Sequence, residues 1–320
     1  MLLEKFPNAD SNKDGELTVP EAIAYYQKML ADRKKKPGKK SGPKPTHTNV
    51  SYGPDKRNVL DLWLVDSKKP TPLVIYIHGG GFVGGSKNGT SPEIIQQAHK
   101  RGISVAAINY RFVFKFPFPA PQHDGARAIQ FLRHHAEKYN VDPNLFAAFG
   151  GSAGAGISMW LGYHDDLANP KSEDLIERAS SRVCAVGSLG GQSTYDPAVI
   201  EQWVGGRAHE HPSIYYCYNV KTLEELADPK LQPLYDEVSA IKHLTKDDPP
   251  TYMFYNEENK PMRAGARPGE GIHHPIFGIK LQEALNKLNI ESEFHNESNA
   301  QKILLPTMLD FFENQFAKQK

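Results

Sequence analysis

The sequence has few cysteines, no long apolar run and almost no net charge. Its 320 residues include two cysteines, Cys184 and Cys217, and carry a formal net charge of +1. Two cysteines are too few for a disulfide framework, so they leave the redox compartment open. No apolar run approaches the roughly 18 residues that span a bilayer, so we expect no membrane span. The balanced charge gives no reason to expect nucleic acid as a partner.

The sequence does contain a regular alternation of apolar runs and helical patterns. The runs predict strands, and the segments of about 10–15 residues between them have helical spacing. Together they predict an α/β fold, a mostly parallel sheet with helices on both faces. We expect strands at 58–65, 73–77, 103–109, 145–149, 182–189, 250–255 and 290–295, and helices at 92–101, 126–139, 155–164, 277–288 and 304–316.

Two glycine motifs follow two of these expected strands. HGGGF occupies residues 78–82 after the strand at 73–77, and GGSAG occupies 150–154 after the strand at 145–149. The second is a G-x-S-x-G nucleophile elbow, in which small neighbours let Ser152 stand clear of the backbone. The first is an oxyanion loop, in which glycines let backbone N–H groups point at one place. The alternative is that both motifs are only glycine turns at the ends of strands. Under that interpretation the occurrence of both motifs in one chain is a coincidence.

The ordered pair of motifs carries a family resemblance. Over about residues 49–316 the chain resembles the α/β-hydrolase fold and, within it, the hormone-sensitive-lipase-like esterases. The resemblance implies a serine esterase that acts on a small-molecule ester, with a short acyl or carbohydrate-linked group, and needs no cofactor for catalysis. Ser152 would be its nucleophile. The oxyanion would be stabilised by the N–H groups of Gly80, Gly81 and Ala153.

The acid of the expected catalytic triad departs from the family pattern. The pattern puts the acid after the strand at 250–255, where this chain has the amide Asn259. Three nearby carboxylates can replace it, namely Glu257, Glu258 and Glu270. We choose Glu258 as the acid, and a solvated loop carboxylate is the alternative for each of the three.

The histidine of the triad departs from the pattern too. The family places it beyond the last strand, but residues 297–302 contain no histidine, and His295 comes too early. His273 and His274 precede the helix expected at 277–288, in a loop that leaves the same sheet edge as the acid. We choose His274 as the base; the alternative is a helix-capping loop or an adventitious metal-binding pair. Because two positions depart from the family, the rival function is a catalytically degenerate relative that binds a ligand.

The N-terminal segment has the pattern of a calcium-binding EF-hand loop. Residues 10–21 match its twelve positions, with glycine at the sixth and glutamate at the twelfth. Alternate positions turn inward in such a loop and give a hard cation its oxygen ligands. The expected ligands are Asp10, Asn12, Asp14, Glu16 through its backbone carbonyl, and Glu21. A turn that caps a helix is the alternative, and the lack of a second loop favours a structural calcium site over a switch.

These motifs divide the chain into three expected parts. Residues 1–34 would form the EF-hand-like segment, 35–48 a basic linker rich in proline and glycine, and 49–320 the α/β-hydrolase domain. Residues 196–242 break the strand–helix rhythm, so we expect a cap over the site there. The calcium loop resembles segments attached to secreted bacterial hydrolases. We therefore expect a secreted or periplasmic protein whose leader has been removed, with a cytoplasmic protein as the alternative.

Overall fold

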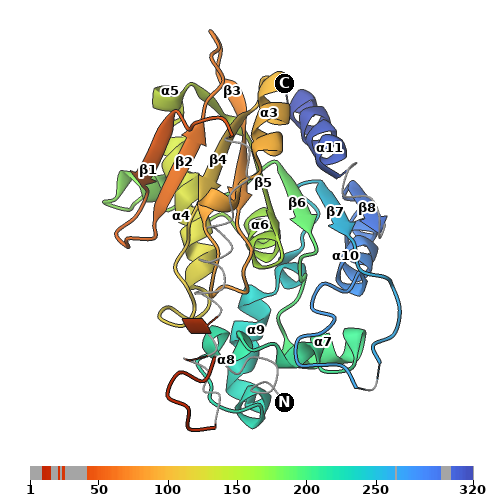
Figure 1. Cartoon of the computed structure of the whole chain (residues 1–320). Coiled ribbons are helices and arrows are strands. Elements are labelled where there is room, and N and C mark those ends of the chain that lie inside the picture. Colours follow the sequence, from red (N-terminus) through yellow and green to blue (C-terminus); the bar gives the residue numbers. More distant parts are fainter. Residues whose placement is uncertain are drawn as a thin grey trace.

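The protein is built around an eight-stranded sheet with helices on both faces (Figure 1). The computed structural model describes residues 9–15, 21, 24–25, 42–263, 265–296 and 304–319. The strands are β1 (His47–Ser51), β2 (Val59–Trp63), β3 (Thr71–Ile77), β4 (Ser104–Ile108), β5 (Val141–Gly151), β6 (Ala185–Leu189), β7 (Thr251–Tyr255) and β8 (Ser292–Asn296). They lie side by side in the order β1-β2-β4-β3-β5-β6-β7-β8.

Helices connect most of these strands. They are α3 (Pro92–Lys100), α4 (Ala120–His134), α5 (Ala136–Tyr139), α6 (Ala153–Tyr163), α7 (Pro197–Val204), α8 (Ile214–Cys217), α9 (Gln232–Val238), α10 (Ile276–Lys287) and α11 (Leu304–Lys318). Short 3-10 helices are η1 (Lys87–Gly89), η2 (Leu175–Arg178), η3 (Ala208–Glu210), η4 (Glu224–Ala227), η5 (Pro229–Leu231) and η6 (Ala240–His243).

The sheet is mostly parallel, as the alternation of strands and helices predicts. β2 pairs antiparallel with both β1 and β4, whereas all pairs from β4 through β3, β5, β6 and β7 to β8 are parallel. The expected α/β-hydrolase architecture is therefore confirmed. β1 is not among the expected strands, because its first residues fall within the stretch interpreted as a linker.

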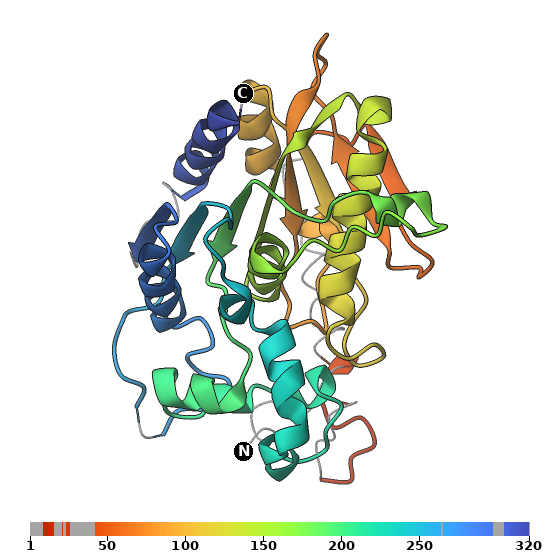
Figure 2. The same cartoon turned by 180° about the vertical axis from the view of Figure 1, so that it is seen from behind.

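Two apolar cores lie on the two faces of the sheet. Leu73, Ile75 and Ile77 of β3 pack into one core and Val74 into the other, because side chains alternate along a strand. Helices α4, α6 and α10 contribute to the first core, and α3 and α11 to the second (Figures 1 and 2). Every residue of α6 is buried, which is why its sequence is apolar all round. This packing makes the junction of β5 and α6 a rigid support.

Between β6 and β7 the chain leaves the sheet. This connection contains α7, α8 and α9, and it lies beyond the carboxyl ends of the parallel strands (Figures 1 and 2). In open parallel α/β sheets that edge is where ligands bind. The elements occupy 197–243, close to the insertion expected at 196–242, and their role as a cap stays a prediction. In the part of the chain that the structure describes, no helix combines the length and the apolar character needed to cross a membrane.

Candidate active site

Ser152 occupies the turn between β5 and α6. β5 ends at Gly151 and α6 begins at Ala153, so a single residue makes the change of direction. Its backbone has φ 52° and ψ −122°, a strained conformation that residues with a side chain rarely adopt. A β-carbon on Gly154 would lie 2.0 Å from the carbonyl oxygen of Ile77, so only glycine fits there. The close approach of β3 thus supports the sharp turn that presents Ser152 Oγ.

The glycine loop after β3 packs directly on this turn. A β-carbon on Gly79 would lie 2.6 Å from the carbonyl oxygen of Gly151, so the two backbones touch. Gly80 has φ 115° and Gly81 has φ 59°, both in the region that favours glycine. The N–H of Gly84 donates to the carbonyl of Gly80 at 3.0 Å, which folds the loop back on itself.

Backbone N–H groups from the two turns are available to a ligand. Within the described residues, no atom accepts a hydrogen bond from the N–H groups of Gly80, Gly81 or Ala153. Ala153 is the first residue of α6, where an N–H group has no acceptor within the helix and the helix dipole favours negative charge. All three residues line the same cavity as Ser152. Chemically, this arrangement suits an oxyanion.

His78 holds the glycine loop in place. Its ring stacks on that of Tyr110 with centroids 4.2 Å apart, and its Nδ1 lies 2.8 Å from the carbonyl oxygen of Gly79. The guanidinium of Arg57 lies 3.2 Å from Nε2 and also covers the ring of Phe112. Both ring nitrogens of His78 are therefore used by the scaffold, which leaves neither for the substrate.

The imidazole of His273 lies against the serine. Its Nε2 is 2.9 Å from Ser152 Oγ, and its Nδ1 is 3.6 Å from Oε1 of Glu257. Glu257 follows β7 and His273 precedes α10, so both belong to one connection at the carboxyl edge of the sheet. Gln192 Nε2 donates to the carbonyl of Ile272 at 2.5 Å and so fastens the histidine loop. Serine, glutamate and histidine follow one another in the chain order usual for α/β-hydrolases.

The structure corrects the choice of His274 and Glu258, which lie one residue too late. His274 is buried, with Nε2 2.9 Å from the carbonyl oxygen of Lys260, and its Nδ1 accepts from the N–H of Ile276 at 3.1 Å. It therefore caps the start of α10 instead of reaching Ser152. Glu258 is exposed and forms an ion pair with Lys260 at 2.6 Å. Neighbouring loop residues point in different directions here, which spacing in the sequence does not reveal.

Two further side chains considered from the sequence lie elsewhere. Glu270 accepts hydrogen bonds from Arg263 and Arg267, and the bond from Arg263 is the main reason that the pKa of Glu270 falls to about 2. His295 lies in β8, where its Nε2 is 3.4 Å from Oε2 of Glu293. Glu270 is thus engaged by arginines, and His295 sits on an edge strand.

A cavity of about 260 Å³ opens beside Ser152. Part of its wall is aromatic, formed by Phe82, Phe118, Tyr195 and Tyr218. The rings of Phe82 and Phe118 meet edge to face with centroids 4.8 Å apart, so this wall is packed and well defined. A cavity with an aromatic wall beside Ser152 can hold a small apolar group of a ligand.

The insertion supplies a polar part of the same wall. Nδ1 of His211 lies 2.7 Å from Oγ of Ser213. Burial, together with the nearby His273, lowers the pKa of His211 to about 4, so this imidazole is neutral near pH 7. Nδ1 of His209 is buried and has no hydrogen-bond partner among the described residues. Nothing in the sequence indicates His209, His211 or Ser213, since a His-x-His pattern within an expected cap does not by itself indicate a site.

The N-terminal loop folds around its own side-chain oxygens. The Asp10 carboxylate accepts from the N–H groups of Lys13 at 2.6 Å and Gly15 at 3.0 Å. Glu21 Oε1 accepts from the N–H groups of Ser11 at 2.9 Å and Asn12 at 3.2 Å. The twelfth position of the loop pattern is thus bonded back to its beginning. Of the other expected calcium ligands, Asp14 belongs to this loop, and Glu16 lies outside the described residues.

A family model described as BD-FAE matches residues 60–263, more than half of the chain. The chain belongs to the BD-FAE family. The matched span contains both glycine motifs, Ser152 and Glu257, and it ends before His273. In this BD-FAE protein the imidazole beside the serine therefore comes from a stretch outside the match.

Curated relatives of this BD-FAE protein cover part of it. The chain is 26% identical over 215 residues to the probable carboxylic ester hydrolase LipM of Mycobacterium tuberculosis, which aligns 66% of this chain with 47% of LipM. It is 31% identical over 144 residues to the probable isoprenylcysteine alpha-carbonyl methylesterase ICMEL1 of Arabidopsis thaliana, which aligns 45% of this chain with 30% of that protein. The chain thus spans less than half the length of these relatives.

Solved structures share its architecture. The acetyl ester-xyloside bifunctional hydrolase from Caldicellulosiruptor lactoaceticus is similar with a TM-score of 0.62 and 24% identity, over 82% of this chain and 88% of that one. Esterase B from Lactobacillus rhamnosis is similar with a TM-score of 0.68 and 16% identity, over 94% of this chain and 97% of that one. At these identities the likeness concerns the fold.

Proposed function

We propose that the protein is a serine carboxylic ester hydrolase, of the carboxylesterase or carbohydrate esterase type. The observation that carries the proposal is the 2.9 Å distance between His273 Nε2 and Ser152 Oγ. An imidazole at this distance can take the hydroxyl proton, which makes a serine nucleophilic. Relatives named as a probable carboxylic ester hydrolase and a probable methylesterase support the same reaction class. The two glycine motifs support the finer resemblance to hormone-sensitive-lipase-like enzymes.

The first half of the reaction forms an acyl-enzyme. Ser152 Oγ attacks the ester carbonyl carbon while His273 Nε2 takes the hydroxyl proton. The carbonyl oxygen becomes an oxyanion and accepts hydrogen bonds from the N–H groups of Gly80, Gly81 and Ala153. The loss of one such donor costs on the order of 3 kcal/mol in related enzymes. His273 then gives its proton to the leaving alkoxide, the carbon–oxygen bond to the alcohol breaks, and the alcohol departs.

The second half releases the acid. A water molecule gives a proton to His273 Nε2 and attacks the acyl carbon, and the same N–H groups stabilise the second oxyanion. The bond to Ser152 Oγ breaks, the serine recovers its proton from His273, and a carboxylic acid leaves. Glu257 supports both halves by holding the Nδ1–H tautomer and stabilising the imidazolium. Its 3.6 Å distance from Nδ1 is longer than a hydrogen bond, and such contacts commonly tighten when substrate binds.

The cavity supports a substrate with a small acyl group. Its volume of about 260 Å³ lies just below the usual range for sites that hold drug-sized ligands, about 300–1,000 Å³. The aromatic wall suits a short alkyl or acetyl group, while His209 and Ser213 offer polar partners to an alcohol with hydroxyl groups. His211 is neutral near pH 7, so it adds no charge that would oppose the formation of imidazolium at His273.

The direct test is labelling by a fluorophosphonate probe, measured by intact mass. The parent protein should gain one probe adduct, and Ser152→Ala should gain none. The same proteins should then be compared on p-nitrophenyl acetate, butyrate and octanoate, where the cavity volume predicts a preference for the shorter esters. A folded parent protein that neither takes the label nor hydrolyses acetate would support the rival function, a degenerate relative that binds a ligand.

We also propose a structural calcium ion in the N-terminal loop. The support is the donor set, since the side-chain oxygens of Asp10, Asn12, Asp14 and Glu21 suit a hard cation. Among the described residues, the three carboxylates of this set do not all come within 4.8 Å of one another. The proposal therefore rests on donor chemistry and on the loop turn at Gly15, which has φ 86°. A calcium site favours a secreted or periplasmic location, which stays a prediction.

Thermal denaturation tests the calcium proposal. Calcium at 100 times its dissociation constant should stabilise the native state by about 2.7 kcal/mol, and excess chelator should remove that gain. Glu21→Gln should abolish the calcium-dependent shift, because it removes the bidentate carboxylate. Glu258→Gln, at an exposed glutamate outside the loop, should retain the shift. Identical melting curves with calcium and with chelator would contradict the proposal.

A further inference from the structure

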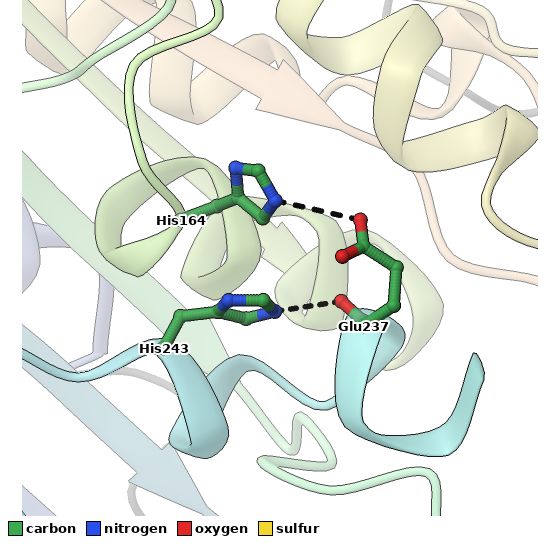
Figure 3. Close-up of side chains that lie close together, drawn as sticks. All are labelled: His164, Glu237 and His243. Carbon is green, nitrogen blue, oxygen red and sulfur yellow. Dashed lines mark hydrogen bonds and ion pairs between the residues drawn. The ribbon is translucent and has the colours of Figure 1, made fainter. Parts of the chain in front are cut away.

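A second group of histidine and glutamate side chains lies outside the active site. His164 follows α6, Glu237 lies on α9, and His243 ends η6. One ligand atom of each lies within 4.8 Å of those of the other two. Figure 3 shows the ring of His164 directed toward the Glu237 carboxylate and the ring of His243 directed toward the backbone carbonyl oxygen of Glu237. The group therefore connects the C-terminal end of the buried helix α6 with the part of the insertion that returns to the sheet.

His164 is prepared to offer its Nε2. Its Nδ1 lies 2.9 Å from the carbonyl oxygen of Asp165, so Nδ1 carries the proton and donates it there. Nε2 lies 3.4 Å from Oε1 of Glu237, so in the neutral ring it offers a lone pair beside this carboxylate. The ring is fixed by stacking on Trp160, with centroids 4.1 Å apart. A backbone carbonyl that orients the second ring nitrogen is the usual support of a metal-binding histidine.

His243 can offer its Nε2 as well. That nitrogen lies 2.7 Å from the backbone carbonyl oxygen of Glu237, which also accepts from the indole N–H of Trp160 at 2.8 Å. The backbone carbonyl of Glu237 therefore accepts two hydrogen bonds, and one of them is enough to satisfy it. If the ring turns so that Nε2 leaves this carbonyl and the proton moves to Nδ1, the carbonyl keeps its bond to Trp160 and Nε2 becomes a ligand. The tautomer change thus leaves no buried polar group without a partner.

The donor set and exposure select the kind of ion. We propose that His164, Glu237 and His243 bind a divalent transition-metal ion of the zinc class, with water completing the coordination. Two imidazoles and one carboxylate suit zinc, whereas calcium and magnesium prefer oxygen ligands alone. The side chains of His164 and Glu237 are 15% and 33% exposed, which leaves room for water.

The ion would be structural, not catalytic. The eleven residues of α6 place the group about 16 Å along the helix from the elbow. At that distance a bound ion does not touch the ester. It would fasten the insertion, which supplies the polar wall of the cavity, to the helix that begins beside Ser152. Removal of zinc should therefore loosen the insertion while the elbow keeps its geometry.

Calorimetric titration with zinc chloride tests the site in the full chain. The protein is first stripped with chelator and then saturated with calcium, so that the N-terminal loop does not compete. One equivalent of zinc should bind and raise the melting temperature. Glu237→Gln keeps the backbone carbonyl and should weaken zinc binding by more than about 100-fold, the upper end of the loss from a supporting residue. His164→Gln removes a different ligand and should have the same effect.

Two control variants locate the binding. His134→Ala changes an exposed histidine on α4 and should bind zinc as the parent does. His273→Ala removes the imidazole beside Ser152 and should also leave the affinity unchanged. Zinc binding that survives both Glu237→Gln and His164→Gln, or that disappears in His273→Ala, would overturn the proposal. So would the absence of a stoichiometric event in the folded parent protein, which would reduce the group to a hydrogen-bonded contact.

Discussion

The two ends of α6 place similar side chains in different surroundings. Near its N-terminal end, Nδ1 of His273 lies 3.6 Å from Oε1 of Glu257; at its C-terminal end, Nε2 of His164 lies 3.4 Å from Oε1 of Glu237. The first pair adjoins a strained serine and the positive end of the helix dipole, which favour attack and a developing negative charge. The second adjoins the indole of Trp160, which stacks on His164, and the backbone carbonyl of Asp165, which accepts from His164 Nδ1. Neighbours, more than residue types, are thus the basis on which we propose proton transfer at one end and metal binding at the other.

The largest expected effect comes from removing the imidazole beside the serine. His273→Ala should lower kcat/KM by about three to six orders of magnitude, because Ser152 loses its base. His274→Ala is the matched control: it removes the adjacent imidazole, which contacts Lys260 and the start of α10. This control should stay within about tenfold of the parent. The measurement is hydrolysis of p-nitrophenyl acetate at a temperature below the melting point of every variant.

The opposite ranking would contradict the site described here. A large loss in His274→Ala with an active His273→Ala would return the role of base to His274. It would also mean that the loop between β7 and α10 rearranges when substrate binds, since the two rings now point away from each other.

The carboxylate beside the base should matter less than the base itself. Glu257→Gln keeps the shape of the side chain but removes the charge that stabilises the imidazolium. We expect kcat/KM to fall about 10- to 1,000-fold, less than the roughly 10⁴-fold loss seen for a buried triad aspartate. The reason is that Glu257 is 41% exposed and lies 3.6 Å from Nδ1. Glu258→Gln, the adjacent exposed glutamate, should change little; equal losses in the two variants would argue against Glu257.

The sequence predicts the strands and glycine turns at the N-terminal end of α6 well for a local reason. The apolar runs and glycines that form β3, β5 and the two turns are contiguous in the chain, so pattern and turn chemistry suffice. The choice between His273 and His274 depends on the path of a long connection between β7 and α10. That path is set by contacts such as Gln192 with Ile272, which lie about eighty residues apart in sequence.

The other end of α6 is not visible in the sequence at all. His164 lies more than seventy residues before Glu237 and His243, which are six residues apart, and the three belong to no motif. Their side chains come together because α6 is buried and because α9 and η6, the last elements of the insertion, pack beside its C-terminal end. The same holds for His211, which enters the cavity from the insertion and carries no local signal.

Stability against acid should report on the half-buried imidazole of His211. The pKa of His211 in the folded state is about 4, below the ordinary value of 6.5. Above about pH 6.5 the imidazole is neutral in both the folded and the unfolded state, so its protonation takes nothing from the free energy of unfolding. As the pH falls from 6.5 to 4, only the unfolded state takes up the proton, and stability is lost. The loss from this group is at most about 3 kcal/mol. Urea unfolding at several pH values should give a shallower acid loss for His211→Gln; parallel curves for parent and variant would contradict this expectation.

The smallest expected effect tests the tautomer change proposed for the zinc site. Trp160→Phe removes the indole N–H, so the carbonyl of Glu237 depends on His243 alone. Zinc then takes away the last donor of this carbonyl, which costs about 1 kcal/mol and weakens zinc binding about fivefold relative to the parent. The variant also leaves a small cavity at a fully buried position. The cavity lowers the stability of the free and of the zinc-bound protein alike. Because it cancels, the change in zinc affinity reports on the lost hydrogen bond and on the altered stacking against His164. An unchanged or tighter affinity would mean that His243 does not give up its bond to the carbonyl when zinc binds.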